Sequence, residues 1–171
     1  MNLVDVQEGK IIPDELKGVT LSHKRARDYE LEPGDLLLSS RGTTLKMMVV
    51  TLDDLKSKPM VFSQNFLRVR VSDPNRYDPY FIKAFLESPV GQYYLQAYQR
   101  GTTVTVLSHK DVASISLPLL PIEEQGEIVR RILEAENQYE ETVKRARQSF
   151  VQSYRDSYEL MSIADTFDVI D

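Results

Sequence analysis

The amino-acid sequence predicts a mixed α/β domain of the α+β class with an antiparallel-leaning sheet, followed by one long C-terminal helix. Short apolar runs separated by turn residues predict the strands, and two capping residues that each precede a proline predict short helices. After Pro121 no further proline occurs, and apolar or small residues recur at steps of three and four, which predicts the long helix. We therefore expect a globular domain over residues 1–121, a helix over residues 122–158 and an acidic tail over residues 159–171.

Composition narrows the range of functions. The hydrophobic share of 42% is sufficient for a core. The sequence contains no cysteine, which excludes disulfides and thiolate metal ligands, and its two histidines lie far apart, so no histidine metal cluster is expected. No apolar run approaches the length of a membrane span, and the N-terminus lacks a signal pattern. The expected location is therefore the cytoplasm.

The net charge of −5 is unevenly distributed along the chain. Residues 1–121 carry 15 Lys and Arg against 14 Asp and Glu, whereas residues 122–171 carry 6 against 12. The acidity thus belongs to the helix and tail, and the globular part can still present a basic face. This distribution permits DNA binding without demonstrating it.

The chain begins with a predicted short strand within residues 3–6 and a turn at Pro13. A basic cluster follows over residues 22–27, and it fits two interpretations. One is an ordinary solvated loop or first helical turn. The other is contact of Lys24 and Arg25 with phosphate groups.

A Pro33-Gly34 turn precedes the apolar run of residues 36–38, which predicts a short buried strand. A loop of hydroxyl side chains separates this run from a strand over residues 47–50, so the two strands should form a hairpin-like pair. Such a loop suits contact with phosphates or base edges, because glycine permits close approach and arginine can pair bidentately with guanine. The loop residues expected there are Ser40, Arg41, Gly42, Thr43 and Thr44. A structural alternative pairs Arg41 with Asp35.

The clearest predicted strand covers residues 60–71, where alternation places Phe66, Arg68 and Arg70 on one face. A face with two arginines should meet solvent or a partner, and both suit phosphate contact. Gln64 and Asn65 are expected to begin this strand, and either amide can read an adenine edge. The alternative is a polar outer face without a ligand, with Asn65 capping the strand edge.

Asp78 and Ser88 each stand before a proline, which predicts helices over residues 80–87 and 90–99 with core aromatic side chains. A glycine turn into a β-branched strand follows, then a capped single turn at Ser108 and a last strand over residues 113–117 with Ile115 and Leu117 facing inwards. Polar residues of this part are further candidates for base contact: Arg100, Thr102, Thr103, His109 and Lys110.

The long helix has an apolar seam close to a heptad repeat, which indicates a partner helix. The seam residues are Ile128, Ile132, Ala135, Tyr139, Val143, Ala146, Phe150 and Tyr154. At about 1.5 Å per residue the helix would be roughly 55 Å long. It can fold back on its own domain or act as a spacer and dimer helix, and its length and charged outer faces favour the second.

Several stretches carry a family resemblance, and they follow one another along the chain: Pro33-Gly-Asp-Leu-Leu-Leu-Ser-Ser-Arg-Gly-Thr43, Ser63-Gln-Asn-Phe-Leu-Arg68, Asp78-Pro-Tyr-Phe-Ile82, Gly101-Thr-Thr-Val104, Leu107-Ser108 and Ile115-Ser-Leu-Pro-Leu-Leu-Pro-Ile-Glu-Glu-Gln125 with Ile128. In this order they resemble the DNA specificity (S) subunits of type I restriction-modification systems, as one target recognition domain plus one spacer helix. Leu120 departs from a usual second proline, and Gly126 stands where a better helix former is common. Glycine there costs about 1 kcal/mol of helix stability, so the helix is expected to fray or bend at its base.

The resemblance implies a sequence-specific DNA-binding subunit that reads one half of a split double-stranded target, with the helix fixing the distance to the other half. Family members typically carry two recognition domains, so a chain of 171 residues would be a half-size subunit or half of a larger protein. The implied partners are the methyltransferase (modification) subunit, the restriction subunit and, through the helix, a second copy. The resemblance implies no catalysis and no cofactor in this chain.

Two other classes of function remain at this stage. One is a nuclease that uses scattered carboxylates such as Asp35, Asp53 and Asp54, although the adjacent pair reads more simply as a solvated turn. The other is a protein-interaction module with a coiled-coil arm and no DNA ligand.

Overall fold

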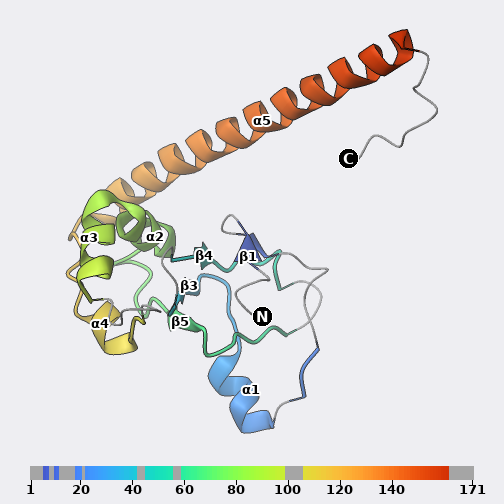
Figure 1. Ribbon diagram of the computed structural model, residues 1–171. Coiled ribbons are helices and arrows are strands. Elements are labelled where there is room, and N and C mark those ends of the chain that lie inside the picture. Colours follow the sequence, from blue (N-terminus) through green and yellow to red (C-terminus); the bar gives the residue numbers. More distant parts are fainter. Residues whose placement is uncertain are drawn as a thin grey trace. The chain divides into compact units, whose positions relative to one another are not determined.

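The computed structural model describes residues 6–7, 10–11, 18–20, 22–41, 45–55, 59–98 and 106–161 (Figure 1). The chain divides into two compact units, Met1–Val129 and Arg130–Asp171. The first unit holds a small antiparallel sheet and short helices, and a long helix runs to the end of the described chain. These elements confirm the predicted α+β class.

A three-stranded antiparallel sheet in the order β4-β3-β5 forms the centre of the first unit. The central strand β3 (Leu36–Ser39) pairs with β4 (Met47–Val49) on one side and with β5 (Phe66–Val69) on the other. Leu37 lies opposite both Met48 and Arg68. The first of these pairings confirms the predicted hairpin-like arrangement.

Two further short strands, β1 (Val6–Gln7) and β2 (Lys10–Ile11), form a separate antiparallel pair. The turn predicted at Pro13 lies outside the described residues.

Every residue of β3 is buried, because apolar side chains cover both faces of the sheet. Alternate residues enter two cores. The helix-side core contains Leu36, Leu38, Met47, Val49, Leu67, Ile82, Leu86, Leu95, Leu107 and Ile115. The second core contains Leu31, Leu37, Met48, Val50, Phe62 and Phe66. The face that carries Phe66 is therefore packed, and the expectation that it meets solvent or a partner is wrong at its apolar end.

Four short helices belong to the first unit: α1 (His23–Tyr29), α2 (Pro79–Glu87), α3 (Pro89–Tyr98) and α4 (His109–Ala113). The Asp78 carboxylate accepts a hydrogen bond from the Tyr80 N–H at 2.7 Å, and the Ser88 hydroxyl oxygen accepts one from the Gly91 N–H at 3.2 Å. Both capping residues thus start helices where the sequence predicts them. The basic cluster at residues 22–27 begins α1 as a helical turn.

Two predicted strands need correction. Gln64 and Asn65 form a turn before β5, because the Phe66 N–H donates to the Ser63 carbonyl at 3.0 Å. Residues 115–117 form no strand: the Ile115 N–H donates back to Val112 in the last turn of α4 at 3.2 Å, so it is not available to a ladder. Ile115 is nevertheless buried, as expected.

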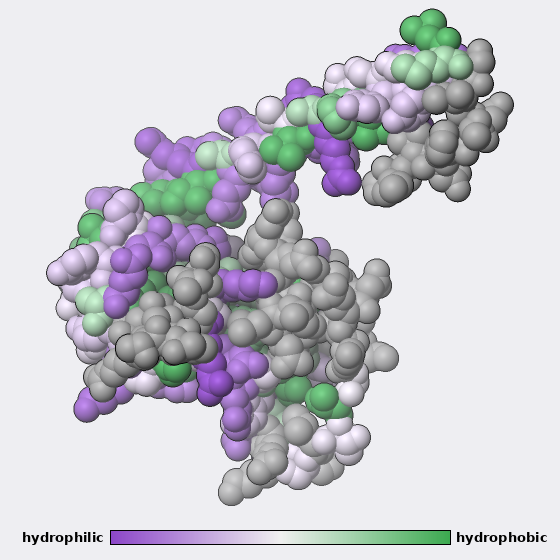
Figure 2. Space-filling model, in the orientation of Figure 1, coloured by the Kyte–Doolittle hydropathy of each residue, from purple (hydrophilic) through white to green (hydrophobic). Residues whose placement is uncertain are grey.

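Helix α5 (Ile122–Leu160) begins directly after Pro121 and is 39 residues long. It runs unbroken through Gly126, so the expectation of a frayed base is wrong. Every seam residue from Ile132 onwards is exposed in the single chain, among them Tyr139 at 71% and Phe150 at 62%. Figure 2 shows hydrophobic areas, in green, alternating with hydrophilic areas along the helix. Among the described residues, no helix has the length and apolar character needed to cross a membrane.

Candidate nucleic-acid interface

Ser40, at the end of β3, connects three segments of the first unit. Its N–H donates to the Asn65 carbonyl at 2.8 Å, and its carbonyl accepts from the Leu107 N–H at 2.9 Å. Its hydroxyl donates to the Gln64 carbonyl at 3.3 Å. Ser40 is only 5% exposed, so these bonds satisfy its polar groups within the fold. The segments around residues 40, 64–65 and 106–107 therefore meet at one place, which we call the Ser40 junction.

The junction contains members of two of the segments that the sequence singles out for base contact, and its third segment, residues 106–107, lies between the two parts of the remaining one. Arg41 and Val106 form an antiparallel bridge beside Ser40, and both are exposed. Gln64 is exposed and Asn65 half-buried. Within the described part of the chain, no carboxylate lies within ion-pair distance of the Arg41 guanidinium. Arg41 and Gln64 thus present their side chains to solvent at neighbouring points.

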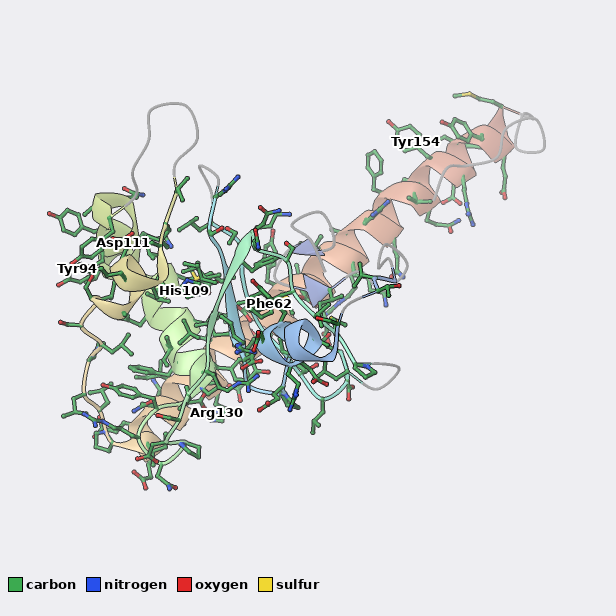
Figure 3. All side chains as sticks on the ribbon, turned by 90° about the horizontal axis from the view of Figure 1, so that it is seen from below. Phe62, Tyr94, His109, Asp111, Arg130 and Tyr154 are labelled. Carbon is green, nitrogen blue, oxygen red and sulfur yellow. The ribbon has the colours of Figure 1, made fainter. Side chains whose placement is uncertain are left out.

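Helix α4 follows the junction directly, and its start is fixed by a capping box. The Ser108 hydroxyl oxygen accepts from the Asp111 N–H at 3.3 Å, while the Asp111 carboxylate accepts from the Ser108 N–H at 3.0 Å. His109 and Lys110, in the first turn, are exposed. Figures 1 and 3 show α4 beside α3, with His109 and Asp111 on the first helix and Tyr94 on the second. Both candidate residues are therefore at the surface, two to three positions beyond Leu107.

Arg70 has a different environment from the one expected. Its Nε donates to Asp35 Oδ1 at 2.6 Å and its Nη2 to Oδ2 at 2.7 Å, and its Nη1 reaches Glu32 at 2.5 Å. The hydrogen bond to Asp35 is the largest cause of a raised pKa at Arg70. Asp35 therefore pairs with Arg70, and the alternative that paired it with Arg41 is wrong. The guanidinium of Arg70 is committed to two carboxylates, which leaves little of it for phosphate.

Arg68 is also held within the fold. Its Nη1 donates to the Glu30 carbonyl at 2.7 Å, and its guanidinium lies over the Phe62 ring at 5.4 Å from the centroid. The ring itself makes an edge contact with Tyr29, with centroids 5.4 Å apart. These contacts join β5 to the segment that follows α1, and they give Arg68 a structural role.

Other candidate residues lie outside what the structure describes. Lys24 and Arg25 belong to the first turn of α1, but their side chains are not described. The remaining candidates are outside the described residues altogether: Gly42, Thr43, Thr44, Arg100, Thr102 and Thr103. In the chain, residue 41 directly precedes Gly42, Thr43 and Thr44. Residue 106 directly follows the stretch 99–105, which contains Arg100, Thr102 and Thr103.

The carboxylates considered for a nuclease have local roles. Asp35 binds Arg70, and Asp54 accepts hydrogen bonds from the N–H and hydroxyl of Thr51 at 2.8 and 2.6 Å. The second arrangement confirms a turn at Asp53 and Asp54. In the described part of the chain, no cluster of three or more His, Cys, Asp or Glu side chains could hold a metal ion.

Sequence reasoning singled out candidate segments for base contact but did not show which of them are joined in the fold. Ser40 was expected to contact DNA with its side chain, whereas its buried backbone organises the junction. The only signal in the sequence was that Ser39 and Ser40 directly continue an apolar strand, which makes them part of its ladder. Gln125 was missed as a buried polar side chain, although its place in the first turn of a helix directly after Pro121 could have suggested it.

Comparison with known proteins agrees with the resemblance. The family model described as the type I restriction modification DNA specificity domain matches residues 5–146. The specificity subunit of the type I restriction enzyme EcoKI from Escherichia coli (strain K12) is 24% identical over 135 residues. The match covers 77% of this chain and 29% of that subunit, so the chain spans less than a third of the curated relative's length.

The extent of the family match settles the broad class of this protein. The match covers most of the described residues, including all members of the Ser40 junction and the first part of α5. Specificity subunits of these systems are non-catalytic, which supports the expectation that this chain is not an enzyme. The chain belongs to the type I restriction modification DNA specificity domain family.

Proposed function

We propose that this chain reads one half of a split double-stranded DNA target through the side chains gathered at the Ser40 junction. The observation that carries the proposal is the set of hydrogen bonds that join Ser40 with Gln64, Asn65 and Leu107. Loops aimed by a rigid sheet are the usual carriers of base contacts. Because β3 is wholly buried, the junction has the rigid support that such reading needs.

The candidate contacts then fall into two kinds. Arg41 reads guanine, and Gln64 or Asn65 reads adenine, on the geometry of their side chains. Lys24, Arg25 and Lys110 attach the domain to phosphates. Arg68 and Arg70 instead hold the sheet, since their guanidinium groups bind Glu30, Asp35 and Glu32. In this division residues 1–121 form the target recognition domain.

Helix α5 (Ile122–Leu160) serves as the spacer and pairing element, two residues longer than the expected 122–158, and an acidic tail follows it in the sequence. Its exposed seam supports pairing with another helix, because isolated long helices gain most of their stability from packing. The partner is a second copy of this chain or the equivalent helix of a longer specificity subunit. An antiparallel pair would bring Glu123, Glu124 and Glu127 of one helix toward Lys144, Arg145 and Arg147 of the other.

The remaining partners are a modification subunit and a restriction subunit, which would supply methylation and cleavage. The proposal is tested by a mobility-shift titration of the full chain, alone and with the modification subunit of the same system, on a pool of random duplexes. Enrichment of one sequence is the expected result. Failure to shift any duplex in either form would instead indicate a protein-interaction module with a coiled-coil arm.

A further inference from the structure

Gln125 in the first turn of α5 is a fully buried polar residue, with 0% of its surface exposed. Its Oε1 accepts from the Asp78 N–H at 3.0 Å. Its Nε2 donates to the Arg76 carbonyl at 2.9 Å and to the Leu120 carbonyl at 2.8 Å. All three partners are backbone groups, and two of them are more than 45 residues away in the sequence.

These bonds link three segments of the first unit. Asp78 is the capping residue of α2, Arg76 belongs to the turn before it, and Leu120 lies two residues before α5. Both amide hydrogens are used, and the oxygen accepts one further bond, so the side chain has a single orientation that satisfies it. A glutamate would turn a carboxylate toward two carbonyl oxygens, and an apolar side chain would leave three part-buried backbone groups without this partner.

We propose that Gln125 is a positioning residue that fixes the direction in which α5 leaves the recognition domain, and thereby the spacing between the two halves of the DNA target. This inference rests on the proposed function. The first two turns of α5 belong to the compact first unit, and Gln125 is the only residue of α5 that is buried among those described. The other residues of these turns are exposed or half-buried, and Gln125 is the one among them whose side chain binds backbone groups of distant segments in the bonds described above.

The physical reason is that spacing depends on stiffness as well as length. When two binding sites are linked, a stiff connection of matching span favours one geometry, whereas a looser one spreads the same binding over several. One added base pair moves a half-site by about 3.4 Å and turns it by roughly 35°. A helix whose base is firmly held cannot adjust its direction to this rotation of the half-site. A helix whose base lacks the Gln125 hydrogen bonds can.

The test is a selection from duplexes with about two helical turns of randomised sequence, followed by sequencing of the bound fraction. Full-length chains are used: the natural protein, Gln125→Met, and Gln125→Asn as a milder variant that keeps an amide. Gln148→Met makes the same chemical change at an exposed position of α5. Met48→Ala removes a buried side chain of the second core and controls for general destabilisation.

The natural chain should select two sequence blocks at one spacing, favoured about tenfold or more over spacings one base pair longer or shorter. Gln125→Met should select the same blocks, with neighbouring spacings bound within about threefold of each other. Gln148→Met and Met48→Ala should keep the single spacing. If Gln125→Met does not fold, Gln125→Asn is read by the same criterion.

Retention of the single spacing by both Gln125 variants would overturn the inference and leave the proposed function intact. An equal spread of spacings in Met48→Ala would also overturn it, because looseness of the whole fold would then explain the effect. Selection of one block or none by the natural chain would contradict the proposed half-target reading itself. The proposed role of Gln125 would then also be contradicted, because it depends on that reading.

Discussion

The carboxylate of Asp35 accepts two hydrogen bonds from the guanidinium of Arg70, at 2.6 and 2.7 Å. The Asp35 side chain is 0% exposed, whereas that of Arg70 is 36% exposed. The second Asp35 oxygen also accepts the Glu32 N–H at 2.8 Å and so closes the turn that contains Gly34. Gly34 has a φ of 86°, a conformation that favours glycine. This pair therefore ties the turn before β3 to the residue that follows β5.

Replacing Arg70 with alanine should destabilise the fold, because it leaves the buried Asp35 carboxylate without its cationic partner. We expect a loss of roughly 2–3 kcal/mol in the free energy of unfolding, below the range for wholly buried pairs since Arg70 is partly exposed. Urea denaturation followed by circular dichroism measures it. Arg41→Ala, at an exposed position with no carboxylate partner among the described residues, should change stability by less than about 0.5 kcal/mol. Equal effects of the two changes would remove the structural role of the Asp35–Arg70 pair.

Gly91 and Gly126 provide a second comparison, since both are helical glycines in opposite surroundings. A Cβ at Gly91 would lie 2.1 Å from the Phe85 carbonyl oxygen and 2.5 Å from the Leu86 Cα, so α2 and α3 would have to separate. Gly91→Ala should therefore cost at least about 1–3 kcal/mol.

Nothing lies within 4 Å of a Cβ at Gly126. Gly126→Ala should therefore stabilise α5 by up to about 1 kcal/mol, because alanine favours the helix. Thermal unfolding of the two variants should show shifts of opposite sign. A stabilised Gly91→Ala would mean that the two helices are not in close backbone contact.

The local elements could be predicted because their signals lie within a few residues. Asp78 and Ser88 each stand beside a proline and start a helix, and residues 36–38 form a short apolar run that is buried. Ser108 and Asp111 are three residues apart and close a capping box. In each case the residues that determine the structure are neighbours in the sequence.

What the sequence did not reveal depends on partners far along the chain. Arg70 and Asp35 are 35 residues apart, and nothing in either segment indicates the other. The hydrogen bonds of Gln125 to backbone groups of Arg76 and Asp78 could not be predicted for the same reason, because these partners lie far away in the sequence. Residues 115–117 have the pattern of a strand but no ladder partner, because strand formation depends on what lies beside the segment. The segments of the Ser40 junction could likewise be described one by one from the sequence, but their meeting at one place could not be predicted.

Self-association through α5 should be visible in solution. At tens of micromolar the natural chain should scatter light as a dimer, because its exposed seam is covered only when another helix packs on it. Val143→Glu together with Phe150→Glu should shift it to a monomer, since both residues belong to that seam. Gln148→Glu adds a charge on the opposite side of the helix and should leave the mass unchanged. A monomeric natural chain would argue against self-pairing and favour a longer partner.

Lys110→Ala should weaken binding to all DNA sequences to the same degree. A phosphate contact carries no sequence information, so its loss lowers affinity uniformly and reduces the salt dependence by about one unit of slope. Titrations of selected and random duplexes at several salt concentrations measure both quantities. Ser116, exposed beyond α4, offers a control in Ser116→Ala, which should leave the slope unchanged. A changed base preference in Lys110→Ala would assign Lys110 to base reading instead.

The central claim is that bases are read at the Ser40 junction, and Arg41 tests it most directly. The measurement is the affinity of the natural chain and of Arg41→Ala for the selected duplex, for each single base-pair substitution of one half-site and for random DNA. Arg41→Ala should lose about 1–3 kcal/mol on the selected duplex, relax the preference at one base pair and leave binding to random DNA nearly unchanged. Equal losses on selected and random DNA, with an unchanged circular dichroism spectrum, would contradict base reading by Arg41 at this junction.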